Sequence, residues 1–146
     1  MNIILHIGTP KTATTLLQEW LYANIENLSK QGVYLSNTIG RGNNIKLVSF
    51  FKKDLDNYMK RKRVTSLEEK EKFYSGFEAN FIKEVEEAKK NHHTMVISSE
   101  NFYNTLGDCE EIEAVCTFLK KISDNIKVVC YFREQSQMSL SMYSTV

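Results

Sequence analysis

Three short runs of apolar residues limit the fold of this chain more than any other feature. They span residues 2–7 (NIILHI), 94–99 (TMVISS) and 126–132 (IKVVCYF). Continuous runs of this length are typical of strands that are buried on both faces of a sheet. The segments between them have helical periodicity, and strands that alternate with helices form parallel sheets with right-handed crossovers. We therefore predict an α/β fold with a central parallel sheet.

The remaining segments predict helices and one small strand. The helices are expected at residues 12–32, 45–63, 66–91, 109–123 and the start of 134–146, and the strand at 33–35. Ser66 and Glu69 have the spacing of a capping box at the start of the third helix. Two apolar helix faces are expected to form core: Leu16, Leu17, Trp20, Leu21 and Ile25 in the first helix, and Phe73, Phe77, Phe81 and Val85 in the third.

The length of 146 residues suits one domain with a sizeable core. We expect a single domain over residues 1–146, with a helical insertion at about 40–92. The sequence stops at Val146, within a segment that is expected to be helical. We therefore expect either a fragment of a longer protein, incomplete at its C-terminus, or a naturally short chain.

Charge and cysteine usage exclude several classes of function. The net charge of +1 creates no global field that would favour nucleic acid or a membrane surface. No apolar stretch approaches the roughly 20 residues of a membrane span. The cysteines, which are Cys109, Cys116 and Cys130, have neither an even count nor a metal-type spacing. We expect reduced thiols in a cytoplasmic protein, a buried Cys130, and no metal site.

The stretch GTPKTATT, residues 8–15, joins the first strand to the first helix. A helix N-terminus offers unpaired N–H groups, to which Lys11 adds a charge and Thr12, Thr14 and Thr15 add hydroxyl groups. The stretch therefore predicts a phosphate-binding loop. The alternative is that Thr12 is only an N-cap and Lys11 a solvated lysine. It is not the Walker A motif G-x-x-x-x-G-K-S/T, because Pro10 precedes the lysine and the glycines are missing.

A second anion-binding pattern follows the third apolar run. Arg133 lies at the end of this run, and Ser141 follows eight residues later on the next helix. An arginine at a strand end can bind a phosphate with two parallel N–H bonds. Ser141 could reach the same anion only if the chain bends back. Taken alone, the pair also fits an ordinary salt bridge at a strand end.

Together, PKTATT and the downstream R-x7-S-x-Y resemble the sulfotransferases that use 3′-phosphoadenosine 5′-phosphosulfate (PAPS). The flanking HIGTPKT, LLQ and R-x-Q look most like the bacterial, carbohydrate-directed branch. The resemblance covers roughly residues 2–20 and 94–143. It implies a P-loop-NTPase-like three-layer sandwich and PAPS as cosubstrate, with no metal. It also implies a bacterial source and transfer of a sulfuryl group to a hydroxyl or amine, of a carbohydrate in this branch.

The resemblance also assigns site residues. Lys11 would contact the 5′-phosphate and the bridging oxygen, while Arg133 and Ser141 would bind the 3′-phosphate. The rest of the 5′-phosphosulfate loop would be Pro10, Thr12, Ala13, Thr14 and Thr15. Ala13 replaces the family's loop glycine, which is tolerable in a helical conformation but not at positive φ. REQSQ replaces the R-N-P-x-D of cytosolic members, and the family's C-terminal glycine-rich segment has no counterpart here.

The second apolar run ends at Glu100, which we expect to be the general base for the acceptor. Alternatively, Glu100 pairs with Lys11 or Arg133, or caps a helix. His6 is a second candidate base, although a hydrogen-bonded structural histidine is the more ordinary role at this position. The basic run at 60–63 could guide an anionic acceptor, but it reads better as a solvated helix end.

The leading hypothesis is therefore a PAPS-dependent sulfotransferase. The main alternative is a catalytically inactive module with the same fold that binds nucleotide or glycan. A nucleotide kinase is disfavoured by Pro10 and Ala13, which do not fit a Walker A loop.

Overall fold

The computed structural model describes residues 1–144 and contains a four-stranded, all-parallel sheet in the order β2-β3-β1-β4. The strands are β1 (Asn2–His6), β2 (Val33–Tyr34), β3 (Thr94–Ser98) and β4 (Ile126–Val129). Each predicted apolar run thus forms a strand, and the short strand after residue 32 is also present. The prediction of an α/β fold with a parallel sheet is confirmed.

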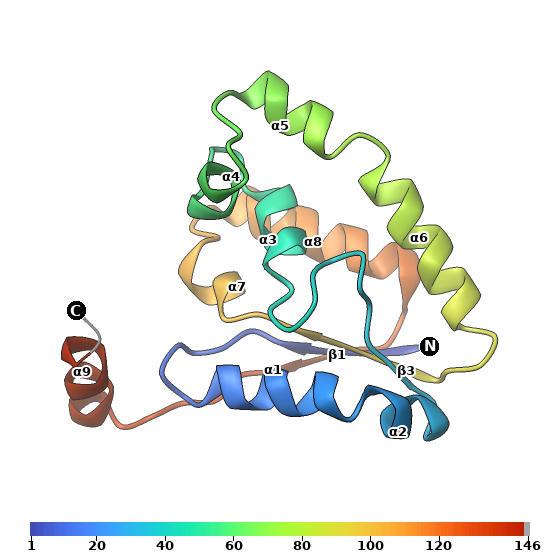
Figure 1. Ribbon diagram of the computed structural model, residues 1–146, viewed down its shortest axis with the longest axis horizontal. Helices are drawn as coiled ribbons and strands as arrows, with labels where there is room; N and C mark the ends of the chain where they lie inside the picture. The colour runs from blue at the N-terminus through green and yellow to red at the C-terminus, as the bar shows by residue number, and fades with distance from the viewer. Residues whose placement is uncertain (145–146) are drawn as a thin grey trace.

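Helices lie on both sides of this sheet. Their bounds are α1 (Thr14–Ala23), α2 (Ile25–Lys30), α3 (Ile45–Phe51), α4 (Asn57–Arg61), α5 (Leu67–Phe73), α6 (Phe77–Ala88), α7 (Asn101–Asn104), α8 (Cys109–Ile122) and α9 (Gln135–Tyr143). Figure 1 shows α1 and α2 below the sheet and α3, α6 and α8 above it, while α9 stands apart from the body. None of the helices among residues 1–144 is long and apolar enough to cross a bilayer.

Three segments that we predicted as single helices are each divided in two. Residues 12–32 form α1 and α2, which meet at Asn24. Residues 45–63 form α3 and α4, because the chain becomes extended at Lys52. Residues 66–91 form α5 and α6, because Gly76 adopts the left-handed conformation with φ 73°. The predicted cap at Ser66 is confirmed, since its Oγ accepts a hydrogen bond from the Glu69 N–H at 3.2 Å.

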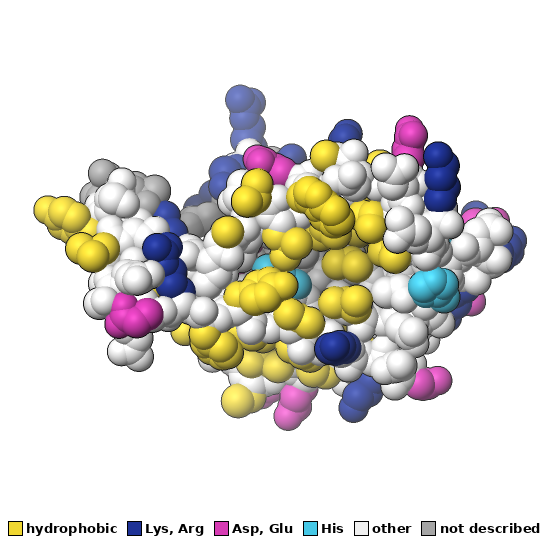
Figure 2. All heavy atoms as spheres, turned by 90° about the horizontal axis from the view of Figure 1, so that it is seen from below, with side chains coloured by type: hydrophobic (Ala, Val, Ile, Leu, Met, Phe, Trp, Pro, Cys, Tyr) yellow, Lys and Arg dark blue, Asp and Glu magenta, His cyan; other side chains and the backbone are white. Residues whose placement is uncertain are grey.

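The predicted apolar face of the first helix is wrong at two of its five positions. Leu16 and Trp20 are 68% and 54% exposed, whereas Leu21 is buried as predicted, with Leu17 and Ile25 packed partly buried beside it. The other buried side chains of α1 are Thr14, Gln18 and Tyr22, which were not predicted. Figure 2 views the molecule from the side on which α1 lies and shows hydrophobic side chains gathered across this face. Two polar side chains of α1 therefore point toward the sheet, which places them beside the ends of the strands.

The core lies mainly between the sheet and the upper helices. Phe77, Phe81 and Val85 of α6 are buried in it, as predicted, together with Met95 and Ile97 of β3. Phe73 departs from the prediction because it belongs to α5, on the other side of the break, and is 39% exposed. The helical segments between β2 and β3 thus form much of the layer that covers the sheet.

The prediction that residues 126–132 form a strand buried on both faces is also wrong. β4 pairs with β1 and forms the edge of the described sheet, and its Lys127 and Val128 are exposed. Cys130 lies beyond the end of β4 and is only half-buried. A continuous apolar run does not distinguish a central strand from an edge strand, because in both the side chains point to the two faces of the sheet and can pack against the layers there.

A buried acidic residue ties the upper layer together. The Glu111 side chain is 1% exposed and lies 3.0 Å from the Lys52 ammonium. Its carboxylate also accepts hydrogen bonds from the backbone N–H groups of Lys53, at 2.8 Å, and Gly107, at 3.3 Å. Burial acts to raise the pKa of Glu111, but these donors outweigh it and hold the pKa below its ordinary value.

Replacing Glu111 by alanine is expected to lower the free energy of unfolding by about 3–5 kcal/mol, because it leaves buried donors and a cation without their acceptor. Urea denaturation would measure this, with Glu113→Ala, at an exposed position of the same helix, as the matched control. The lowered pKa means that the carboxylate stabilises the fold above its ordinary pKa and loses this effect as the pH falls through the folded value. Equal unfolding midpoints for the two variants would contradict this role.

Candidate functional site

The carboxyl ends of three strands meet at one edge of the sheet. His6 is in register with Ser98 of β3 and Val129 of β4, so the residues that follow each strand lie side by side. Backbone hydrogen bonds continue this pairing past the strands, from Thr9 N to Tyr131 O at 2.9 Å and from Tyr131 N to Gly8 O at 2.7 Å. Ligands of open α/β sheets bind at this edge.

The predicted phosphate-binding stretch, residues 8–15, includes a loop at 8–13, before α1, that is held by its own threonines. Thr12 Oγ1 donates to the Thr9 carbonyl at 2.6 Å, and Thr9 Oγ1 donates to the Tyr131 carbonyl at 3.0 Å. Thr14 is buried at the start of α1, and Thr15 is exposed. These hydrogen bonds fix the conformation of the loop.

The N-terminus of α1 opens at this loop. Its N-cap residue is Ala13, and no side chain among residues 1–144 caps it. The alternative that Thr12 serves only as an N-cap is therefore wrong, because the Thr12 hydroxyl bonds inside the loop instead. N–H groups of the first helical turn together with the helix dipole provide the donors that a phosphate needs.

Two residues of the loop have left-handed backbone conformations without being glycine. Lys11 has φ 62°, and Ala13 has φ 60° and ψ 28°. Each such residue costs about 1–2 kcal/mol relative to the ordinary conformation. Ala13 therefore has the positive φ that, as noted from the sequence, strains an alanine at this position.

Replacing Ala13 by glycine is expected to raise the free energy of unfolding by about 0.5–1 kcal/mol, because glycine adopts positive φ without strain. Ala23→Gly is the matched control: it makes the same change at the other end of α1, in an ordinary helical position, and should destabilise by about 0.5–1 kcal/mol. Denaturant unfolding would measure both. Destabilisation by both substitutions would contradict the strain at Ala13.

Arg133 lies against the loop. Its Nη1 donates to the carbonyl oxygen of Lys11 at 3.2 Å, although the two residues are 122 positions apart. The chain then turns into α9, where the Glu134 side chain accepts hydrogen bonds from the N–H groups of Ser136 and Gln137. The two sequence patterns that predicted anion binding therefore meet at one edge of the sheet.

Ser141 also returns toward Arg133. Both residues line a hollow of about 320 Å³, together with Gln137, Leu140 and Ser144 of the α9 segment. The bend that this pair required is supplied by the turn at Glu134, which starts α9 directly after Arg133. Arginine and serine side chains around one hollow are suited to hold a phosphate group.

Glu100 lies in the turn between β3 and α7, and side-chain amides hold its carboxylate. Gln18 Nε2 donates to Oε2 at 3.0 Å, and Asn43 Nδ2 donates to Oε1 at 2.9 Å. Glu100 occupies the N-cap position of α7 but makes no side-chain capping bond there. The cap alternative is therefore wrong, and the carboxylate is oriented by neighbours from α1 and from the loop before α3.

The Glu100 backbone also comes close to the phosphate loop. A Cβ atom added at Gly8, where φ is 115°, would lie 3.3 Å from the Glu100 Cα and 3.4 Å from its Cβ. A side chain at position 8 would therefore push the loop and Glu100 apart. Gly8 keeps the two candidate catalytic segments in contact.

His6 is buried at the end of β1, where its Nδ1 lies 2.8 Å from Ser98 Oγ. Its ring packs against Tyr131 with the ring centroids 5.2 Å apart. Burial lowers the pKa of His6, with the Glu100 charge acting in the opposite direction. Nε2 has no hydrogen-bond partner among residues 1–144. These contacts fit the structural role that the sequence offered as the alternative to a base.

No role was predicted for the residues that orient Glu100, although Gln18 belongs to the LLQ stretch that the resemblance includes. Gln18 lies on the buried face of α1, and a lone polar residue among buried positions is the signal that could have identified it. Asn43 also accepts from Ser99 Oγ at 2.5 Å, and Asn44 accepts from Ser98 N at 2.8 Å. Both asparagines come from the GRGNN stretch, which its composition identified only as a loop.

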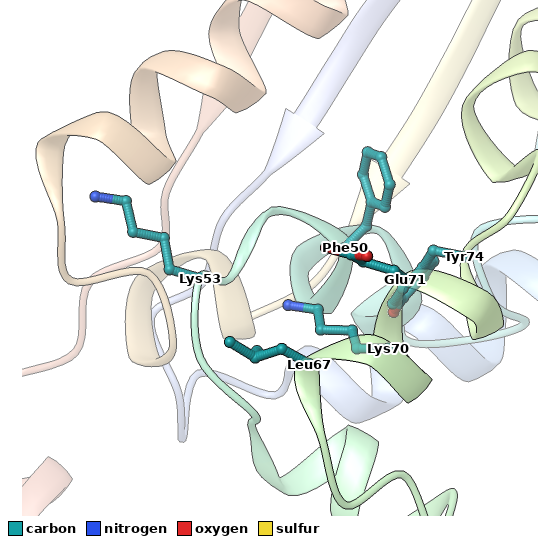
Figure 3. Close-up of a pocket in the computed structure, with 6 residues that line it drawn as sticks. All are labelled: Phe50, Lys53, Leu67, Lys70, Glu71 and Tyr74. Atoms are coloured by element: carbon teal, nitrogen blue, oxygen red, sulfur yellow. The ribbon is translucent and has the colours of Figure 1, made fainter.

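A hollow of about 230 Å³ lies elsewhere, between α3 and α5 in the helical layer. Figure 3 shows its lining, which consists of Phe50, Lys53, Leu67, Lys70, Glu71 and Tyr74. The Lys70 ammonium donates to the Lys52 carbonyl, and burial lowers the pKa of Lys70. None of the predicted site residues lines this hollow, so it serves below as a control site.

Within residues 1–144, no group of three or more His, Cys, Asp or Glu side chains is arranged to hold a metal ion. No family model matches the chain, and neither the curated proteins nor the solved structures include a match to it. The function is therefore inferred from the residues at the carboxyl edge of the sheet.

Proposed function

We propose that this chain is a sulfotransferase that moves a sulfuryl group from PAPS to a hydroxyl or amine group of a carbohydrate. The observation that carries the proposal is the hydrogen bond from Arg133 to the Lys11 carbonyl, at 3.2 Å. It brings a helix-terminal anion loop next to a separate arginine–serine hollow. Two adjacent anion sites fit a nucleotide that carries phosphate groups at both its 5′ and 3′ positions.

The strand order and the position of the loop support the finer fold assignment. The loop follows β1, which lies between β3 and β4, and leads directly into α1. This arrangement fits a P-loop-like three-layer sandwich, in which the loop after a central strand grips phosphate. The left-handed conformations at Lys11 and Ala13 give this loop a shape different from that of an ordinary helix start.

In the proposed reaction an acceptor oxygen or nitrogen attacks sulfur, and the bond from sulfur to the bridging oxygen of the 5′-phosphate breaks. Negative charge grows on the departing phosphate, where the Lys11 ammonium and the N–H groups of the α1 terminus would stabilise it. The acceptor proton passes to the Glu100 carboxylate. Arg133 and Ser141 hold the 3′-phosphate and so fix the position of the reacting group.

Incubation with PAPS labelled in its sulfuryl group, together with a panel of mono- and oligosaccharides, tests the proposal. We expect label to move to at least one sugar, with release of 3′-phosphoadenosine 5′-phosphate (PAP), and the transfer to persist in the presence of a chelator. Nucleotide binding without any transfer would instead support the inactive binding module. No binding of PAPS or PAP would contradict the transferase and a nucleotide-binding module, and would leave only a module that binds glycan.

A further inference from the structure

A polar hollow of about 400 Å³ lies between α4 and α7. This volume lies within the range of roughly 300–1,000 Å³ that is common for small-molecule sites. α7 follows the carboxyl end of β3 directly, so this helix lies at the same end of the sheet as the loop between β1 and α1 (Figure 1). Its lining residues are Ile45, Leu55, Asp56, Asn57, Tyr58, Arg61, Asn101, Asn104 and Thr105.

One side chain connects this hollow to the candidate base. Asn101 Nδ2 donates to Ser99 Oγ at 3.3 Å and to Asn43 Oδ1 at 3.5 Å. Asn43 in turn donates to Glu100 Oε1 at 2.9 Å. Two hydrogen-bonded amide side chains, Asn101 and Asn43, therefore lie between a molecule in the hollow and the Glu100 carboxylate.

The lining suits a molecule rich in hydroxyl groups. Asn57 and Asn104 each offer both a donor and an acceptor, and the Thr105 hydroxyl, which donates to Asn101 Oδ1 at 3.3 Å, can accept a further hydrogen bond. A sugar hydroxyl likewise donates and accepts, so it can accept from one of these side chains and donate to another. The apolar side chains of Ile45 and Leu55, with the ring of Tyr58, provide surface for the C–H face of a sugar ring.

The charges of the lining favour a neutral molecule. Arg61 contributes one positive charge and Asp56 one negative charge, and no other ionisable side chain except Tyr58 lines the hollow. Burial raises the pKa of the Tyr58 hydroxyl, with the Asp56 charge adding to this, so the hydroxyl remains protonated at neutral pH. The basic residues of the 60–63 run other than Arg61 lie outside this lining.

We propose that the hollow between α4 and α7 binds a neutral pyranose ring, and, resting on the function proposed above, that this ring belongs to the acceptor saccharide and neighbours the ring that reacts at Glu100. Asn104 and Arg61 are the test positions, because both side chains are exposed and line the hollow without belonging to the buried core. Leu67→Ala is the matched control, since Leu67 is also exposed and lines the separate hollow in Figure 3.

Saturation-transfer NMR in the absence of nucleotide tests this directly. The probes are the methyl glycosides of glucose, galactose, mannose and N-acetylglucosamine, with methyl glucuronide as the anionic comparison. We expect saturation of ring protons in at least one neutral glycoside and weaker binding of the glucuronide. Combined Asn104→Ala and Arg61→Ala substitutions should weaken binding at least about tenfold, through lost hydrogen bonds. Leu67→Ala should leave it unchanged.

The absence of saturation in all neutral glycosides would overturn the inference, as would preferential binding of the glucuronide or equal binding by the doubly substituted protein. Calorimetry with PAP on the same proteins separates this result from the fate of the proposed function. PAP binding without sugar binding would reject the sugar site alone. Sugar binding that the two substitutions abolish, in a protein that does not bind PAP, would reject the transferase and leave a glycan-binding site.

Discussion

Replacing Lys11 by alanine is expected to slow sulfuryl transfer by about 10²- to 10³-fold, which is the typical effect of removing one group that stabilises developing charge. Lys11 lies in the loop between β1 and α1, and its backbone is held in a left-handed conformation at φ 62°. Arg133 donates to its carbonyl oxygen and so fixes the loop from outside. This conformation of the loop would place the Lys11 ammonium beside the leaving phosphate.

Single-turnover transfer from labelled PAPS would measure this effect, with Lys30→Ala as the control. Lys30 is an exposed lysine in the last turn of α2, so its removal changes the net charge equally without touching the loop. Both variants should keep the unfolding temperature of the parent protein to within a few degrees. Equal transfer rates for the Lys11 and Lys30 variants would remove Lys11 from the reaction.

Replacing Glu100 by glutamine is expected to lower the turnover rate by about 10²- to 10⁴-fold, which is the usual contribution of a general base. Glutamine has nearly the same shape but cannot accept the acceptor proton. The Asn43 amide can still donate to the oxygen of the new glutamine, and the Gln18 amide can turn so that its oxygen accepts from the new NH2 group, so the substituted side chain should stay near its position. The affinity for PAP should change little, because the base would act on the acceptor rather than on the nucleotide.

Turnover rates and PAP affinities should be measured for Glu100→Gln and for Glu19→Gln, an exposed glutamate of α1 that neighbours Gln18. A variant with unchanged turnover would show that Glu100 only orients the loop at Asn43. In that case the proton must leave by another route.

The apolar runs were sufficient to predict the parallel α/β fold, because a strand that is buried from both sides leaves a continuous apolar signature. The breaks within the helices were harder to predict. The helical periodicity of the sequence runs through Gly76 without interruption. The left-handed conformation of Gly76 nevertheless divides α5 from α6. The edge position of β4 depends on which strands pair, and this is a property of the whole sheet.

The candidate site could be predicted in part. The pairing of the loop with Arg133 follows from strand order, because parallel strands carry their carboxyl ends to one edge. The amides around Glu100 could not be predicted in this way. Gln18 and Asn43 come from different elements, and only the packing of α1 and of the loop before α3 against β3 brings them to one carboxylate.

The central claim is that this edge of the sheet recognises a nucleotide with two separate phosphate positions. Calorimetry with PAP, 5′-AMP and ATP–Mg tests it most directly. We expect PAP to bind about 10- to 100-fold more tightly than 5′-AMP, through charge-assisted bonds to the 3′-phosphate, and we expect Arg133→Ala to remove this difference. Tighter binding of ATP–Mg, with indifference to the 3′-phosphate, would contradict the account.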